Sequence, residues 1–196
     1  MAKATDISVK SVKLYYLPIE TRVPLKFGTE TVDKVTCARA AVTVADRNGN
    51  TAVGWGETPL SVQWVWPSSA TYQDRNEALQ QFTARLAEAW SDFDAAGHPM
   101  EVGHAFQQNR LNALLRTFNK DSCGVGENMP YLAALVCCSL FDIAVHDAYG
   151  ILNNMPVYET YNATYMNRDL SAYIEPAADA KSRVSFASRY PADFLD

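Results

Sequence analysis

Several kinds of sequence signal are missing from this chain of 196 residues, and each absence excludes a class of protein. Lysine and arginine number 17 against 22 acidic residues, and no basic run occurs, which argues against nucleic acid as a partner. The most apolar stretch, residues 132–148, is interrupted by polar side chains and is shorter than the ~20 apolar residues that span a bilayer. No apolar segment follows the N-terminal residues, so no signal peptide is expected. We therefore expect a cytoplasmic protein that binds neither nucleic acid nor a membrane.

The sequence also lacks the short motifs of common catalytic and metal sites. The four cysteines show no paired zinc or redox spacing, and they fit buried free thiols in a reducing compartment. There is no phosphate-binding glycine loop, no HExxH and no GxSxG. Two isolated Gly-x-Gly fragments, at 54–56 and 124–126, lack the strand–turn–helix setting of a dinucleotide site.

The first 60 residues have the pattern of an antiparallel meander. Segments 7–17, 35–45 and 51–57 are rich in β-branched and aromatic residues and are predicted to be strands. The Asn48-Gly49 pair between the last two supplies the backbone conformation of a tight hairpin. Residues 18–34 are predicted to be a long loop, and loops of that length are more often functional than idle.

Helical patterns follow the strands. Apolar residues recur at helical spacing in residues 74–93 and 101–118, and the first helix is expected to begin at Asp74. A third helix follows Pro130 and is apolar almost all round, which predicts burial. Residues 170–175 are predicted to form one further short strand. Strands first and helices afterwards indicate an α+β fold, a three-stranded antiparallel meander followed by a helical bundle.

Two groups of residues are candidates for chemistry. Glu57 precedes a tryptophan-containing loop at residues 58–71, where the rings can either line a pocket or cover the sheet. Charged residues of the 18–34 segment can recognise an anionic substrate or be solvated. Asp142 and His146 are four residues apart, so one helix face can bring them together, and a structural polar contact is favoured over catalysis. His98 and His104 are expected to have surface or capping roles.

Two segments together resemble the enolase superfamily, and more closely its mandelate racemase/muconate lactonizing branch. The first is residues 53–59, V-G-W-G-E-T-P, at the end of the meander. The second is the helix at 139–150, S-L-F-D-I-A-V-H-D-A-Y-G, followed by Met-Pro-Val at 155–157. The resemblance implies an N-terminal capping domain at residues 1–130, and a linking helix with the start of an incomplete (β/α) barrel at residues 131–196.

The resemblance also implies a chemistry. Members of the family use Mg²⁺ to abstract a proton α to a substrate carboxylate, and the cation stabilises the negative charge that develops. Racemisation, dehydration and cycloisomerisation all begin in this way. The capping domain supplies two specificity loops, which correspond here to about 20–31 and 57–69. The candidate substrate contacts are Thr21, Pro24, Phe27, Glu57, Trp64 and Trp66.

The chain is too short for the rest of that enzyme, because a complete barrel needs ~250 residues. The catalytic lysines and acidic metal ligands of the family belong to barrel strands beyond this sequence. We therefore expect no catalytic residue and no metal ligand in this chain, no activity from the chain alone, and Mg²⁺ only in the full-length form. Expected partners are a small carboxylate such as an acid sugar, the missing barrel region or a partner chain, and a second copy in a homo-oligomer. The alternatives are a stand-alone binding module that uses the Trp64/Trp66 loop, and an independent enzyme that uses Asp142 and His146.

Overall fold

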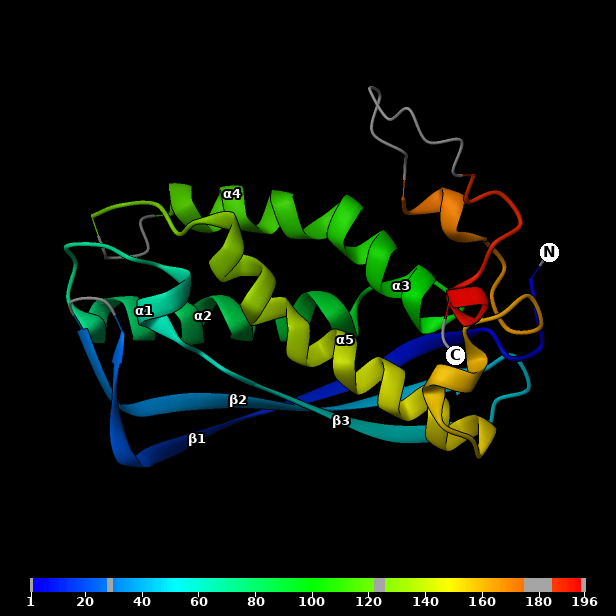
Figure 1. Ribbon diagram of the computed structural model, residues 1–196, viewed down its shortest axis with the longest axis horizontal. Helices are drawn as coiled ribbons and strands as arrows, with labels where there is room; N and C mark the ends of the chain where they lie inside the picture. Colours follow the sequence, from blue (N-terminus) through cyan, green and yellow to red (C-terminus); the bar gives the residue numbers. More distant parts are fainter. Residues whose placement is uncertain (1, 28–29, 122–125, 175–184, 195–196) are drawn as a thin grey trace.

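The computed structural model describes residues 2–27, 30–121, 126–174 and 185–194. A three-stranded antiparallel sheet in the order β1–β2–β3 forms one layer, and the helices lie over one of its faces (Figure 1). The strands are β1 (Ile7–Phe27), β2 (Glu30–Asp46) and β3 (Thr51–Pro59). The predicted α+β class and the antiparallel meander are confirmed.

The predicted loop at 18–34 is wrong, because β1 and β2 continue as a paired ribbon over the described residues 18–27 and 30–34. Ile19 pairs with Val35, and Leu25 pairs with Val32 after an irregularity that begins at Glu20. The segment is rich in β-branched residues, which favour extended backbone. Its prolines are tolerated because β1 is an edge strand, where one side of the strand has no ladder partner.

The turn between β2 and β3 agrees with the prediction. The Asp46 carboxylate accepts hydrogen bonds from the backbone N–H groups of Asn48 and Asn50, at 2.8 and 2.9 Å. A further hydrogen bond from the Asn50 side chain is the main reason why the pKa of Asp46 lies below its ordinary value. Gly49 has φ of 85°, a backbone conformation that glycine adopts without a steric penalty.

The helices confirm the predicted order with corrected boundaries. The first long helix begins before Asp74, because Thr71 is the N-cap and its hydroxyl accepts from the Asp74 N–H at 3.1 Å. The predicted 101–118 helix is two α-helices joined by one π-helical turn. The described helices before the C-terminal segment are α1 (Val62–Val65), α2 (Tyr72–Ser91), α3 (Pro99–Phe106), the π-helix η1 (Gln107–Leu111), α4 (Asn112–Lys120) and α5 (Tyr131–Asn153).

Helix α5 is the centre of the core. It packs on β2, β3 and α2. Trp90 of α2 stacks on Phe106 and on Phe141 of α5, with ring centroids 4.1 and 6.3 Å apart. Cys137 and Cys138 of α5 are buried free thiols, as predicted, whereas Cys123 lies outside the described residues. By length and composition α5 could cross a bilayer, but 56% of its most apolar window is buried inside the protein, which is typical of a core helix.

The segment after α5 contains short helical turns instead of the predicted strand at 170–175, of which residue 175 lies outside the described residues. These turns are the 3-10 helices η2 (Val157–Thr160), η3 (Leu170–Ala172) and η4 (Pro191–Phe194). Asp169 caps η3 by accepting from the Ser171 N–H at 3.0 Å. No strand of the described sheet lies beside this segment, and an extended segment without a neighbour leaves its backbone groups unpaired. The start of a barrel is thus not observed in the described residues, and the division after residue 130 stays a prediction.

The two segments that carry the family resemblance pack directly against each other. A Cβ atom on Gly54 would lie 2.7 Å from the Cα of Ala148, and one on Gly56 would lie 2.7 Å from the backbone nitrogen of Ala144. Only glycine therefore lets β3 approach the backbone of α5 so closely. The contact is fixed by a hydrogen bond of 2.8 Å from the Trp55 N–H to the Asp147 carboxylate.

Candidate functional site

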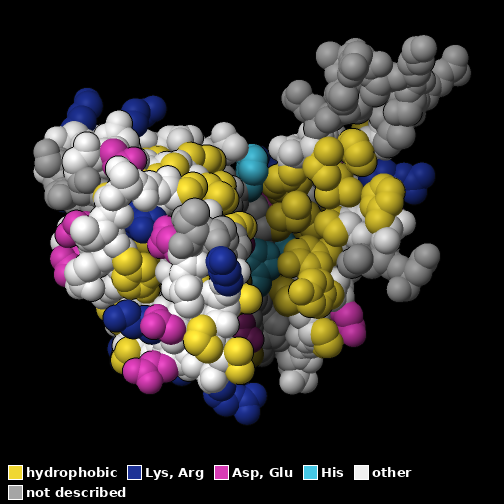
Figure 2. Space-filling view, turned by 60° about the vertical axis from the view of Figure 1, so that its left-hand side comes forward, with side chains coloured by type: hydrophobic (Ala, Val, Ile, Leu, Met, Phe, Trp, Pro, Cys, Tyr) yellow, Lys and Arg dark blue, Asp and Glu magenta, His cyan; other side chains and the backbone are white. Residues whose placement is uncertain are grey.

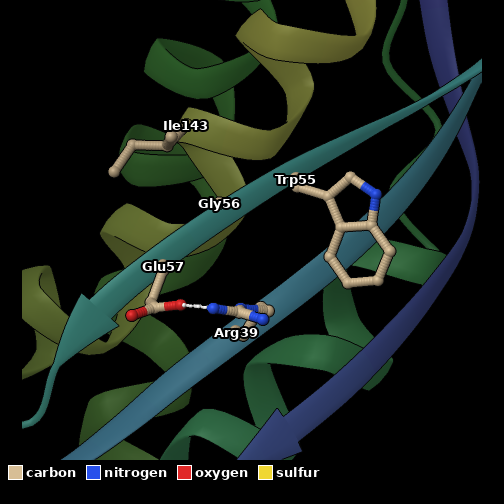
Figure 3. A pocket seen from close by; sticks show the side chains of 5 residues that line it. All are labelled: Arg39, Trp55, Gly56, Glu57 and Ile143. Carbon is tan, nitrogen blue, oxygen red and sulfur yellow. Dashed lines mark hydrogen bonds and ion pairs between the residues drawn. The ribbon is translucent and has the colours of Figure 1, made fainter.

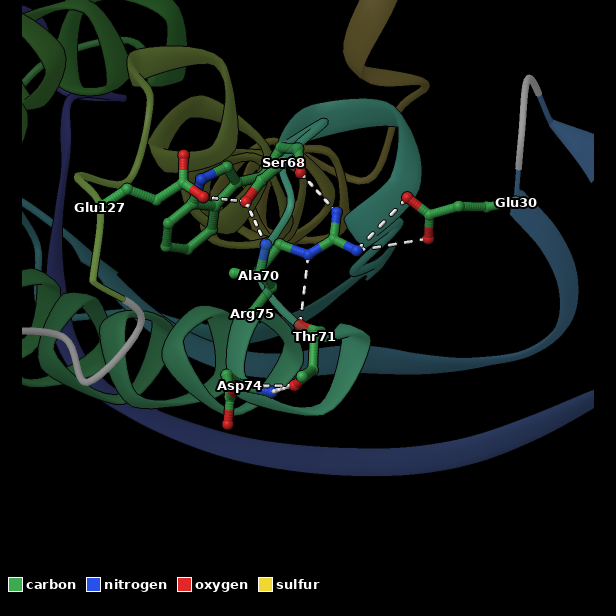
Figure 4. Close-up of polar contacts among 8 residues, drawn as sticks. Glu30, Ser68, Ala70, Thr71, Asp74, Arg75 and Glu127 are labelled. Atoms are coloured by element: carbon green, nitrogen blue, oxygen red, sulfur yellow. Dashed lines mark hydrogen bonds and ion pairs between the residues drawn. The ribbon is translucent and has the colours of Figure 1, made fainter.

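The tip of the β1–β2 ribbon and the segment around α1 lie at the same end of the protein (Figure 1). A buried arginine, Arg75 of α2, joins them. Its guanidinium donates to the carbonyl oxygen of Trp66 at 2.6 Å and to the Glu30 carboxylate at 3.3 Å (Figure 4). A third bond, to the carbonyl oxygen of Thr71 at 3.3 Å, ties the same side chain to the start of α2.

The Arg75 cluster consists of Arg75, Glu30, Trp66 and Thr71, and it is the residue set that sequence reasoning missed. Arg75 occupies a position on the same helical stripe as Leu79 and Phe82, where an apolar residue is expected. An arginine on such a stripe indicates a buried partner, because a buried charge is costly unless it is paired and hydrogen-bonded. The place of Arg75 on this apolar stripe was the sequence signal from which a buried partner could have been predicted.

A hollow of about 510 Å³ lies between the two predicted specificity segments. Glu30, Thr31 and Lys34 border it from the ribbon, and Gln63 borders it from α1. Its walls are mostly polar, with charges of both signs. The geometry therefore brings the two segments to one site that can accept a small polar molecule.

The predicted contact residues of the ribbon lie at or near its tip. The hydroxyl of Thr21 donates to the carbonyl oxygen of Asp33 at 3.2 Å, and Pro24 is exposed to solvent. Phe27 is the last residue of β1 and pairs with Glu30; its side chain lies outside the described part of the structure.

The two tryptophans of the second segment have different surroundings. Trp64 of α1 is 52% exposed, whereas Trp66 is only 2% exposed and packs in the core. The carbonyl oxygen of Trp66 is the acceptor for Arg75. Trp64 is thus placed to contact a partner, and Trp66 holds the segment against the protein.

Glu57 lies apart from these residues, on the face of the sheet that the helices do not cover (Figure 3). Its carboxylate accepts from the Nε of Arg39 at 2.6 Å, across the β2–β3 ladder. Together with Trp55 and Ile143, this ion pair lines a shallow pocket of about 420 Å³. The exposed indole of Trp55 also stacks on Tyr15, with the ring centroids 6.0 Å apart.

The histidines occupy the opposite end, near the segment after α5. His98 is fully buried and caps α3, because its Nδ1 accepts from the Met100 N–H at 3.3 Å and its Nε2 lies 2.9 Å from the Thr160 hydroxyl. Burial, with the nearby His146 and Lys3, lowers the pKa of His98 to about 3, so the ring is neutral. The predicted capping role is confirmed.

Asp142 and His146 are in contact, as their spacing predicts. The nearest oxygen of the Asp142 carboxylate lies 3.8 Å from the Nδ1 of His146. The same Nδ1 lies 2.8 Å from the carbonyl oxygen of Asp142. Burial raises the pKa of Asp142, and the proximity of His146 opposes this shift.

A magnesium site does not fit the side chains in the described part of the chain. Mg²⁺ binds through oxygen ligands arranged around it. Among the residues that the structure describes, no group of three or more histidine, cysteine, aspartate or glutamate side chains is placed to hold a metal ion. No chemical step through Mg²⁺ is therefore assigned to these residues.

Comparison with known proteins finds likeness of fold alone. No protein-family model and no curated protein sequence matches the chain. Among solved structures, the L-Ala-D/L-Glu epimerase from Bacillus subtilis is similar with 13% identity and a TM-score of 0.46, over 79% of this chain and 34% of that one. A mandelate racemase/muconate lactonizing enzyme-like protein from Rubrobacter xylanophilus is similar with 17% identity and a TM-score of 0.43, over 78% of this chain and 33% of that one. The L-talarate/galactarate dehydratase from Salmonella typhimurium LT2 is similar with 16% identity and a TM-score of 0.43, over 84% of this chain and 35% of that one.

The chain thus spans about a third of the length of the solved structures it matches. They are enzymes of the enolase superfamily, the family that residues 53–59 and 139–157 resemble. The activity of the longer proteins belongs to those proteins.

Proposed function

We propose that this chain is the capping portion of an enzyme similar to the mandelate racemase/muconate lactonizing branch of the enolase superfamily. The full form would abstract a proton α to a carboxylate with the help of Mg²⁺, as a racemase, dehydratase or cycloisomerase. The observation that carries the proposal is the convergence of the ribbon tip and the α1 segment at one end of the protein, held by the Arg75 cluster. A cap that selects substrates needs two such segments in a fixed relation.

The surface of this end supports an additional covering element. Ile19, Val23 and Leu25 of the ribbon and Trp64 of α1 are exposed, and Val23 reaches 76% exposure. Large apolar side chains that gather on a surface mark a binding site or an interface. In the proposal, the missing barrel covers these side chains and completes the site.

The expected substrate is a small carboxylate such as an acid sugar. Thr21, Pro24, Phe27 and Trp64 would contact it from the two segments. Trp66 would anchor the second segment from the core. Glu57 forms an ion pair with Arg39 on the uncovered face of the sheet, apart from the two segments, so no contact with this substrate is proposed for it.

A stand-alone binding module is the second candidate, and the hollow of about 510 Å³ between the two segments favours it. In this case the chain alone would bind a small ligand beside Gln63 and Thr31. Binding of the ligand would then not require the barrel region.

Titration separates the two candidates. The chain is titrated with glucarate and with mandelate while its tryptophan fluorescence and its mass in solution are recorded. Self-association without saturable binding supports the capping portion, and saturable binding by a monodisperse chain supports the module. Trp64→Phe should abolish any binding signal from the α1 segment, and Trp55→Phe, on the uncovered face of the sheet, is the matched control.

The reading frame after Asp196 gives the second test of the proposed enzyme. It must encode a pair of lysines followed by a series of acidic residues that can bind Mg²⁺. In the protein extended through that region, α-proton exchange of a carboxylate is followed by NMR in D₂O, and Trp64→Ala should raise KM roughly tenfold through the loss of one aromatic contact. A frame without the lysines and acidic residues refutes the proposal.

A further inference from the structure

A cleft of about 520 Å³ lies between the helical body and the segment that follows α5. Figure 2 shows it as a deep hollow with apolar side chains on both walls and histidine side chains within it. Helices α3, η1 and α5 form one wall, and the turns η2, η3 and η4 form the other. The proposed function does not use this cleft.

The walls of the cleft are aromatic. Tyr158, Tyr161 and Tyr173 line it from the C-terminal segment, and His104 and His146 line it from the helices. The rings meet across the cleft and along its edge: the ring centroids of Tyr173 and His104 are 5.0 Å apart, those of Tyr161 and His146 6.1 Å, and those of Tyr158 and Tyr161 5.8 Å. Aromatic faces carry partial negative charge and attract cations.

The cleft also carries hydrogen-bond acceptors. The Nδ1 of His146 donates to a carbonyl oxygen, which can only accept, so in the neutral ring the Nε2 is left as an acceptor. Asp142 adds a carboxylate, and its pKa is raised because its buried surroundings solvate the charge poorly. The described lining residues therefore offer a carboxylate and π faces, and none of them is a lysine or an arginine.

The Asp142 carboxylate lies where α3 packs on α5. One oxygen of Asp142 lies so close to Gly103 that a Cβ atom at this position would overlap it. The π-helical turn η1 begins at Gln107, which lines the same cleft. Single π-helical turns within helices are frequent at functional sites.

We propose that this cleft binds a small organic cation, a protonated or quaternary amine, with the Asp142 carboxylate as counter-ion and the tyrosine rings as its cage. A carboxylate beside several aromatic faces suits such a cation better than an anion or a neutral polar molecule. This inference is independent of the proposed function, because the residues that line the cleft lie outside the two segments and the Arg75 cluster.

The test uses choline as the cation and dimethylbutanol as its uncharged carbon isostere, with the 196-residue chain and NMR of the ligand methyl protons. We expect saturable choline binding with Kd in the millimolar range and at least roughly tenfold weaker binding of the isostere. Equal binding of the two compounds, or no saturation by choline up to about 100 mM, overturns the proposal.

Variants then assign the binding to the cleft. Asp142→Asn keeps the shape of the side chain and should weaken choline binding about tenfold. Tyr158 is 70% exposed, so Tyr158→Leu leaves the core intact and should weaken binding roughly threefold, whereas Tyr158→Phe retains the ring and the affinity. Tyr15→Leu, on the uncovered face of the sheet, is the matched control and should leave binding unchanged. Circular dichroism verifies that each variant is folded. Unchanged choline affinity in a folded Asp142→Asn variant contradicts the assignment. If Asp142→Asn does not fold, unchanged affinity in Tyr158→Leu contradicts it.

Discussion

Replacement of Gly56 by alanine tests the contact between β3 and α5 on which the fold depends. A Cβ atom at this position would lie 2.7 Å from the backbone nitrogen of Ala144 and closer still to the carbonyl oxygen of Leu140. Ordinary van der Waals contacts of a Cβ atom lie at 3.4–4 Å. Because both obstructing atoms belong to the backbone of α5, no side-chain rotation can relieve the overlap, and the helix must move away from the sheet.

The expected cost follows from this geometry. Overpacking a core by one methyl group typically costs ~1–3 kcal/mol, and a rigid obstacle places Gly56→Ala at about 3 kcal/mol. Alanine lowers the entropy of the unfolded chain relative to glycine, which offsets ~0.5–1 kcal/mol of this cost. The net loss in the free energy of unfolding is therefore about 2–2.5 kcal/mol. For a chain of this size the melting temperature should fall by roughly 5–10 °C.

Urea unfolding followed by circular dichroism measures this loss, and Gly49→Ala is the matched control. Gly49 has no atom within 4 Å of its would-be Cβ, and its φ of 85° costs alanine ~1 kcal/mol. Gly56→Ala should therefore be clearly the less stable variant. If it unfolds at the same urea concentration as Gly49→Ala or higher, the close approach of β3 to α5 is refuted.

Two further predictions concern buried polar residues. Arg75→Met should lower the free energy of unfolding by about 2–3 kcal/mol, because the Trp66 carbonyl and the Glu30 carboxylate lose their donor. The control is Arg85→Met, which removes an exposed ion pair with Asp121 and should cost ~1 kcal/mol or less in the same urea assay. Equal losses would show that Arg75 is not a buried link. The pKa of His98 is about 3 in the folded protein and 6.5 in the unfolded chain, so the unfolded chain binds more protons between these pH values. The contribution of neutral His98 to the free energy of unfolding is therefore complete above pH 6.5 and is lost as the pH falls. At pH 5 the loss is about 2 kcal/mol, and His98→Asn, which retains a capping acceptor, should show a flatter dependence of stability on pH; a parallel dependence would contradict the assignment.

Local sequence signals predicted the elements whose conformation is locally determined. The Asn48-Gly49 turn and the three helical regions were predicted because turn chemistry and apolar periodicity act over a few residues. The ribbon at residues 18–34 was missed because its pairing compensates for prolines that locally disfavour a strand. Residues 170–175 were predicted as a strand from composition alone, although a strand requires a neighbour to pair with.

The candidate site was predictable in its segments but not in its connections. Gln63 of the α1 segment and Thr31 of the ribbon border one hollow, and Arg75 joins the two segments through a contact over 45 positions in sequence to Glu30. Such a pairing depends on how α2 lies on the ribbon, which no local pattern records. Glu57 was grouped with Trp64 by proximity in sequence, but strand alternation places its side chain on the other face of the sheet, beside Arg39.

The motif that carries the family resemblance has a structural explanation in this chain. Gly54 and Gly56 admit the backbone of α5, Asp147 accepts the free N–H of Trp55 at the edge of the sheet, and Thr58 and Ser139 share a hydrogen bond of 2.7 Å. Each of these residues fixes how β3 docks on α5, and none of them is arranged as a catalytic group. A sequence can therefore retain this motif for packing alone. In the described residues this motif is therefore informative about the fold, because each of its contacts is a packing contact.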